Sequence, residues 1–206
     1  MWAARTVVAL GVVYVITGAA GYFLGANQPE HFGVVDPALA VLEILIILCV
    51  PPMITMMAAL HACAVSNKKT WSRVALIFMA LLGSVTSAIH FVELTVVRRI
   101  DLGRAPGLAA VLSFQWPSAA FALDLLAWDV FLGLSMVFAA WAVAGTSGSR
   151  RLRPALVATG ILCLAGTLGP ASGDLRFQIV GIAGYAFVFP VTCVFMAQWF
   201  SQPADG

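Results

Sequence analysis

Five side chains that can gain or lose a proton lie inside long apolar stretches of this sequence. They are Glu43, His90, Glu93, Asp124 and Asp129. A carboxylate or an imidazole in hydrocarbon costs several kcal/mol, about 2.5 or more, unless it is paired, protonated or in contact with water. In a low-dielectric chamber one carboxyl group can hold a proton near neutral pH, while a second group accepts one. The residue types therefore predict acid–base chemistry.

Helical spacing limits how these side chains can meet. His90 and Glu93 are three positions apart, so a helix places them on one face. Asp124 would share a face with Trp128 rather than with Asp129. A common site must therefore draw on several helices.

The composition shows which solvent surrounds those helices. Of the 206 residues, 62% are hydrophobic and 10% are charged, with a mean hydropathy of +0.99. This apolar share is far above the roughly 45–50% of soluble domains and predicts an integral membrane protein. The net charge of +2 is too small to indicate a nucleic-acid partner. The expected partners are the lipid bilayer and a lipophilic small molecule.

Apolar runs between charged or Pro- and Gly-rich breaks predict six helices. The expected ranges are about 5–25, 37–65, 71–98, 118–145, 152–171 and 176–200. The fold class predicted is all-α, a polytopic six-helix transmembrane bundle in a single transmembrane domain over residues 1–206. The first run lacks a convincing small-residue cleavage site, so we expect it to remain as the first helix.

Charge in the connections predicts the orientation. The second and fourth connections are basic, with Lys68, Lys69, Arg73, Arg150, Arg151 and Arg153. The first holds Glu30 and Asp36 without Lys or Arg. The positive-inside rule then makes both termini cytoplasmic in the cell membrane, against a weaker opposing signal from Arg98, Arg99 and Arg104 in the third connection. The end of that connection, residues 109–118, could lie along the outer interface.

This orientation brings four of the ionisable residues to one depth. At ~1.5 Å per residue, Glu43, His90, Glu93 and Asp124 lie roughly 6–12 Å below the outer surface. Asp129 lies deeper, at ~15 Å. Three consecutive helices could therefore converge on one polar chamber.

Isomerisation or cyclisation of a lipophilic substrate is the chemistry that such a chamber favours. Asp124 or Glu93 would protonate a double bond or an epoxide, His90 would act as base or relay, and Glu43 would be its charge partner. Aromatic rings near the chamber could bind the substrate and steady a cation. The candidates are Trp128, Phe91, Phe121, Phe131 and Tyr185.

In architecture and residue types, the chain resembles the small integral-membrane terpene cyclases and sterol isomerases. Those enzymes use acidic residues within helical bundles. The resemblance implies an isoprenoid-like substrate. For this acid–base chemistry we expect no cofactor.

A metal site is an alternative, because Glu43, His90, Glu93 and Asp124 supply carboxylate and imidazole ligands for zinc or iron. Only one histidine is available there, whereas hydrolytic zinc sites commonly have two or three.

Two further alternatives stay open. The carboxylates could couple protons or cations to transport, which prolines inside the helices favour. In a purely structural protein, Glu93 would pair with Arg98 or Arg99 and His90 would hydrogen-bond a neighbouring helix.

Overall fold

The computed structural model describes residues 1–25 and 36–202, and every regular element in these ranges is helical. Six helices within these ranges are long and apolar enough to cross a membrane. This confirms the predicted all-α bundle and indicates a multi-pass membrane protein. Glu30, part of the charge pattern of the first connection, lies outside the described residues.

The first three crossings are nearly continuous helices. They are α1 (Trp2–Gly25), α2 (Ala38–Cys63) and α3 (Lys69–Thr95), with the short 3₁₀ turns η2 (Ser66–Lys68) before α3 and η3 (Val97–Arg99) after it. Pro51 and Pro52 lie inside α2. Lys69 Nζ donates to the carbonyl oxygens of His61 and Ala62, at 2.6 and 3.0 Å, and so satisfies acceptors left free at the end of α2.

The last three crossings are each assembled from several pieces. The fourth comprises α5 (Ala119–Leu125), the π-helical η5 (Leu126–Phe131) and α6 (Leu132–Ala142). The fifth comprises α7 (Ser149–Gly166) and α8 (Leu168–Ser172). The sixth comprises η6 (Leu175–Gln178), α9 (Ile179–Ile182), the π-helical η7 (Ala183–Val188) and α10 (Phe189–Trp199). All six predicted ranges agree with the structure to within a few residues.

The third connection contains the 3₁₀ turn η4 (Leu102–Arg104) and the helix α4 (Pro106–Leu112). Leu108 and Val111 of α4 are exposed. The predicted interfacial segment, residues 109–118, is helical only in its first part, and its second part turns back toward the bundle before Ser118 caps α5.

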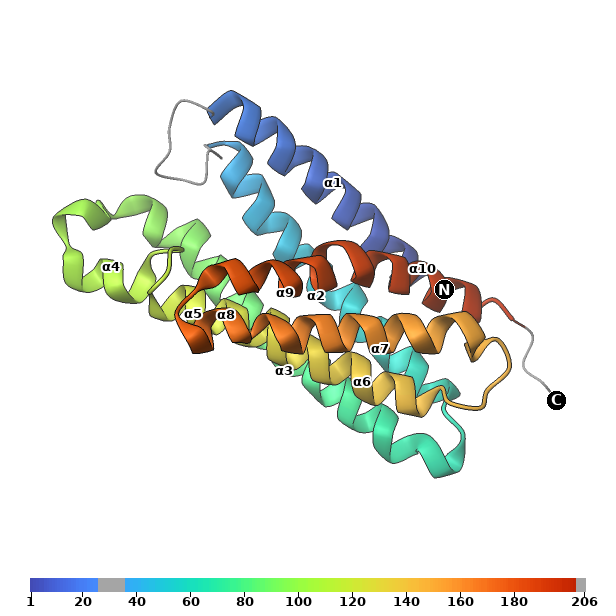
Figure 1. Ribbon diagram of the computed structural model, residues 1–206. Helices are drawn as coiled ribbons and strands as arrows, with labels where there is room; N and C mark the ends of the chain where they lie inside the picture. The colour runs from blue at the N-terminus through green and yellow to red at the C-terminus, as the bar shows by residue number, and fades with distance from the viewer. Residues whose placement is uncertain (26–35, 203–206) are drawn as a thin grey trace.

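Successive crossings run in opposite directions, so α1 begins and α10 ends at the same end of the bundle (Figure 1). We call this the terminal end; the connections between α2 and α3 and between α6 and α7 lie there too (Figure 1). Helix α1 packs on α2 and α10, α3 packs on α2 and α6, and α7 packs on α6 and α10.

The core differs between the two halves of the bundle. The half toward the terminal end is packed with methionine, since Met53, Met56, Met57, Met79, Met136 and Met196 are all buried. The other half contains most of the buried ionisable and amide side chains, namely Glu43, His90, Asp129 and Gln178.

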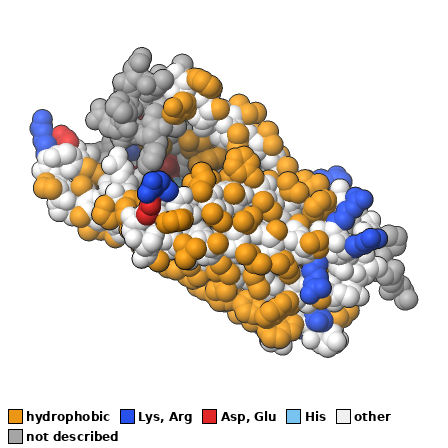
Figure 2. Space-filling model, in the orientation of Figure 1, with side chains coloured by type: hydrophobic (Ala, Val, Ile, Leu, Met, Phe, Trp, Pro, Cys, Tyr) orange, Lys and Arg blue, Asp and Glu red, His pale blue; other side chains and the backbone are white. Residues whose placement is uncertain are grey.

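The formal charges are separated in the same way. Seven of the 11 Lys and Arg residues lie toward the terminal end: Arg5, Lys68, Lys69, Arg73, Arg150, Arg151 and Arg153. Within the described ranges no Asp or Glu lies there, and Figure 2 shows Lys and Arg gathered at this end beyond a largely hydrophobic flank. Toward the opposite end, Arg98, Arg104 and Arg176 are each paired with an aspartate.

Candidate functional site

His90 lies between two carboxyl groups from neighbouring helices. Its Nδ1 hydrogen-bonds Glu43 Oε2 of α2, and its Nε2 lies 3.4 Å from Asp124 Oδ1 of α5. The second distance permits charge attraction but is longer than an ordinary hydrogen bond. Only 2% of His90 is exposed. The structure thus brings together three of the predicted residues in a carboxylate–imidazole–carboxylate arrangement, in which Glu43 and His90 are buried and Asp124 is partly buried.

The local sequence explains how these three side chains meet. Ser118 caps α5 by accepting a hydrogen bond from the amide of Phe121 at 3.2 Å, which sets the start of the helix that carries Asp124. Glu43 lies near the start of α2 and His90 near the end of α3. Because these two helices are antiparallel neighbours, both positions come to the same level of the bundle.

Glu93 completes what we call the His90 cluster, which consists of Glu43, His90, Glu93 and Asp124. The Glu93 carboxylate interacts electrostatically with Glu43 and His90. Its Oε1 is buried without a hydrogen-bond partner among the described residues. In the purely structural alternative, Arg98 is an expected partner of Glu93. Arg98 instead forms an ion pair with Asp36 at 2.6 Å. Glu93 therefore belongs with the buried cluster rather than with Arg98 at the bundle edge.

Aromatic side chains cover the cluster. The ring of Phe114, in the turn after α4, lies 5.6 Å from the His90 ring and 5.5 Å from Phe121. Trp116 contacts Phe121 in turn. The third connection thus places apolar rings over the proton-binding groups.

Asp129 is held on a different side of the fourth crossing. It lies in the π-helical η5, is fully buried, and its Oδ2 accepts a hydrogen bond from Gln178 Nε2 at 2.8 Å. Gly166 and Gly181 leave the space that its Oδ1 fills, since a Cβ atom on either glycine would collide with that oxygen. We call Asp129 and Gln178 the Asp129 pair. It is separate from the His90 cluster, although Asp129 interacts electrostatically with Asp124.

The predicted substrate-binding aromatics divide between these surroundings. Trp128 and Tyr185 contact each other with ring centroids 5.7 Å apart, and Tyr185 also interacts with Asp129 and Gln178. Phe121 is part of the cover over His90. Phe131 packs against Phe78, and Phe91 is 59% exposed on the outside of the bundle. Phe91 and Phe131 therefore do not belong to the aromatic rings that cover His90.

Six buried side-chain atoms in the described ranges have no hydrogen-bond partner. They are Thr86 Oγ1, His90 Nε2, Glu93 Oε1, Asp124 Oδ1, Asp129 Oδ1 and Gln178 Oε1. Five of the six belong to the His90 cluster or the Asp129 pair, and Thr86 lies one helical turn before His90. Because an unpaired buried polar atom costs about 1–3 kcal/mol, this concentration marks the region as built for something other than stability.

The arrangement suits proton transfer better than metal binding. Both ring nitrogens of His90 face carboxylate oxygens, so the imidazole can exchange protons with a carboxyl group on either side. In the part of the chain that the structure describes, no group of three or more His, Cys, Asp or Glu side chains is placed to hold a metal ion. The residues do not fit the zinc or iron alternative.

Comparison with known proteins does not extend the assignment. No family model, curated protein or solved structure matches the chain.

Several contributors to the site were not found from the sequence. Gln178 lies at the border of an apolar run, where a lone amide is unremarkable, and Phe114 lies in a connection whose path the sequence does not define. Gly166 and Gly181 resemble ordinary helix-packing glycines. A polar residue at the mouth of the sixth crossing was the one available signal for Gln178.

Proposed function

We propose that this chain is an enzyme of the cell membrane, with both termini in the cytoplasm, that performs acid–base chemistry on a lipophilic small molecule. The observation that carries the proposal is the buried placement of His90 between Glu43 and Asp124. Burial strengthens electrostatic interactions and limits exchange with bulk water, so a proton can be shared among these three groups.

The geometry suggests a role for each side chain. Glu43 orients the imidazole through its hydrogen bond to Nδ1 and balances its charge. Asp124 or Glu93, each with an unpartnered oxygen, is the acid that donates a proton to a double bond or an epoxide. His90 then serves as base or relay and takes a proton from the resulting cation. One proton enters the substrate and one leaves it, so the net reaction is an isomerisation or a cyclisation.

The substrate class follows from the surroundings. Phe114, Trp116 and Phe121 place apolar rings beside the His90 cluster, and ring faces can stabilise a carbocation. Trp128 and Tyr185 form a second aromatic pair next to Asp129. These features favour an isoprenoid-like hydrocarbon over a polar substrate.

The proposed orientation is supported by the charges at the two ends. The basic residues of the terminal end have no described carboxylate beside them, whereas three arginines of the opposite end are paired with aspartates. Of the arginines and lysines without a described ion pair, seven lie at the terminal end and Arg99 lies at the opposite end, which is the bias that the positive-inside rule expects of a cytoplasmic terminal end.

Comparison of cellular lipids tests the enzymatic proposal. Cells expressing the wild-type chain should contain a lipophilic species that is isomeric with a precursor in control cells. The species should be lost in Asp124→Asn and His90→Gln and retained in Asp101→Asn, which alters an exposed ion pair. Identical lipid profiles for wild type and Asp124→Asn, with both proteins folded in the membrane, would refute it.

A proton-coupled carrier is the second candidate, and one observation favours it. The two π-helical segments, η5 and η7, lie beside the Asp129 pair, and irregular helical turns are frequent where membrane transporters bind their cargo. Solute uptake into liposomes that requires a pH gradient and is lost in Asp129→Asn would select this function.

A further inference from the structure

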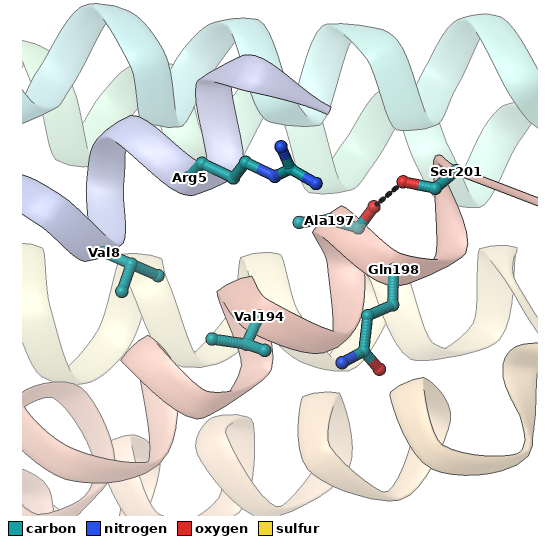
Figure 3. A pocket seen from close by; sticks show the side chains of 6 residues that line it. All are labelled: Arg5, Val8, Val194, Ala197, Gln198 and Ser201. Carbon is teal, nitrogen blue, oxygen red and sulfur yellow. Dashed lines mark hydrogen bonds between the residues drawn. The ribbon is translucent and has the colours of Figure 1, made fainter.

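A cleft at the terminal end lies apart from the ionisable groups discussed so far. It opens between the first turns of α1 and the last turns of α10 and has a volume of about 420 Å³. Its lining comprises Arg5, Val8, Val194, Ala197, Gln198 and Ser201 (Figure 3). The volume falls within the roughly 300–1,000 Å³ of small-molecule sites.

The lining is polar at one level and apolar at the next. Arg5, Gln198 and Ser201 lie closest to the terminal end, whereas Val8 and Val194 lie one turn farther into the bundle (Figure 3). Val194 is 40% exposed, and Val8 packs partly against the core. In a membrane this order matches the interface, with the polar level at the headgroups and the valines at the start of the hydrocarbon.

Arg5 supplies a charge that the described residues do not neutralise. It takes part in none of the described ion pairs, and its side chain extends toward α10 in the close-up view (Figure 3). It lies in the first turn of α1, where unpaired backbone amides and the helix dipole add to the positive potential. Ser201 Oγ donates to the Ala197 carbonyl at 2.8 Å, which leaves its lone pairs able to accept but gives an anion no donor. Arg5 is therefore the principal anion-binding group.

A second basic cleft borders the first. It has a volume of about 280 Å³ and includes Arg150 and Arg151, in the first turn of α7, together with the same Gln198. The two clefts meet at Gln198 of α10, and their linings together contain three arginines. In the described ranges no carboxylate lies at this end to neutralise these arginines.

We propose that the cleft between α1 and α10 binds an anionic phospholipid, with Arg5 on the headgroup phosphate and Val8 and Val194 against the first methylenes of an acyl chain. A phospholipid is the occupant that combines a phosphate with an apolar chain at this depth. The proposal depends on the six helices crossing a membrane and is independent of the reaction at His90.

Lipid retention by the purified full chain tests the proposal. Native mass spectrometry after incubation with dioleoyl phosphatidylglycerol should show retained lipid, with less retention of dioleoyl phosphatidylcholine. Arg5→Gln should weaken phosphatidylglycerol binding about fivefold, since one arginine near an anionic surface contributes about that factor. Arg5→Lys should keep most of the binding.

The matched control is Arg73→Gln, which removes the same charge at the same end but outside both clefts. Binding that falls equally in Arg73→Gln and Arg5→Gln would overturn the proposal, because the charge would then act diffusely. Equal retention of both lipids would overturn it as well.

The apolar level has its own test. Val194→Ser should weaken lipid binding. It should change the melting temperature of the protein no more than Arg73→Gln does. Displacement of the lipid by millimolar inorganic phosphate, or unchanged lipid binding in Val194→Ser, would show a site for free phosphate and contradict a lipid site.

Discussion

Gly166 is shaped to the carboxylate of Asp129: a Cβ atom built on this glycine would lie 2.7 Å from Asp129 Oδ1. Helix α7 and the fourth crossing can approach this closely because Gly166 has no side chain beyond a hydrogen atom. The buried acid is thus enclosed by backbone on the side of its unpartnered oxygen.

Alanine at Gly166 or Gly181 should therefore destabilise the protein. We expect a loss of about 1–3 kcal/mol, the usual cost of overpacking, because Asp129 or the backbone must move. Unfolding in a mixed-micelle denaturant titration measures it. Gly11→Ala is the control, since no atom lies within 4 Å of the added Cβ there. Equal stability of Gly11→Ala and Gly166→Ala would contradict the tight enclosure.

Glu43 and His90 should be energetically coupled. Removing one member of a buried charged pair leaves the other without compensation, so Glu43→Gln should cost about 3 kcal/mol in the wild-type background. In a His90→Leu background the same substitution should cost less than about 1 kcal/mol, because no imidazole remains to be paired. Additive costs in this double-mutant cycle would show that the contact contributes no coupling.

The exposed pair of Asp36 and Arg98 provides the comparison for that cycle. Their side chains are 50% and 34% exposed, so their coupling should be about 0–1 kcal/mol. A larger coupling here than between Glu43 and His90 would mean that burial does not strengthen the His90 contact.

Cys63 reports the orientation without any engineered label. It is exposed near the terminal end of α2, whereas Cys163 and Cys193 are buried and Cys49 is half-buried. A membrane-impermeant maleimide should therefore modify Cys63 in inverted vesicles and leave intact cells unlabelled. Leu108→Cys in a Cys63→Ser background places a thiol on exposed α4 and should give the reverse result. Labelling of Cys63 from outside intact cells would reverse the proposed topology.

Asp174 should make the connection between the fifth and sixth crossings sensitive to acid. Hydrogen bonds from the Arg176 side chain, and then from its backbone amide, hold the pKa of the Asp174 carboxyl below its ordinary value. A depressed pKa means stabilisation that is fully present above the unfolded value of about 3.9 and lost as the pH falls through the native one. Hydrogen exchange at the Arg176 amide should accelerate in that window. Asp174→Asn should abolish this dependence, and Asp36→Asn should leave it unchanged.

The membrane-crossing helices and part of the site could be predicted because they depend on local properties. An apolar run of about 20 residues must become a helix in lipid, which determines the crossings. Glu43 and His90 could be placed at one level because antiparallel neighbours match residues at equal distance from their shared connection. Asp124 follows by the same argument from the start of α5.

The remaining part of the site depends on tertiary structure that has no local pattern. Asp129, which accepts a hydrogen bond from Gln178, lies in the π-helical η5, and a π-helical turn changes the direction of the side chains from that of regular 3.6-residue spacing. The return of Phe114 onto His90 depends on the path of a connection between two helices. Neither contact could be derived from the spacing of residue types alone.

The methionine packing of one half implies an uneven distribution of stiffness along the bundle. Unbranched thioether side chains can change rotamer and refill the space when helices slide, so contacts made by Met56, Met79 and Met136 deform at low cost. At Gly166 and Gly181 the backbones of two helices are in direct contact, and no side chain can change rotamer there to accommodate a shift. Relative helix movement should therefore be concentrated near the chain termini, while the part that holds His90 and Asp129 moves as a rigid block.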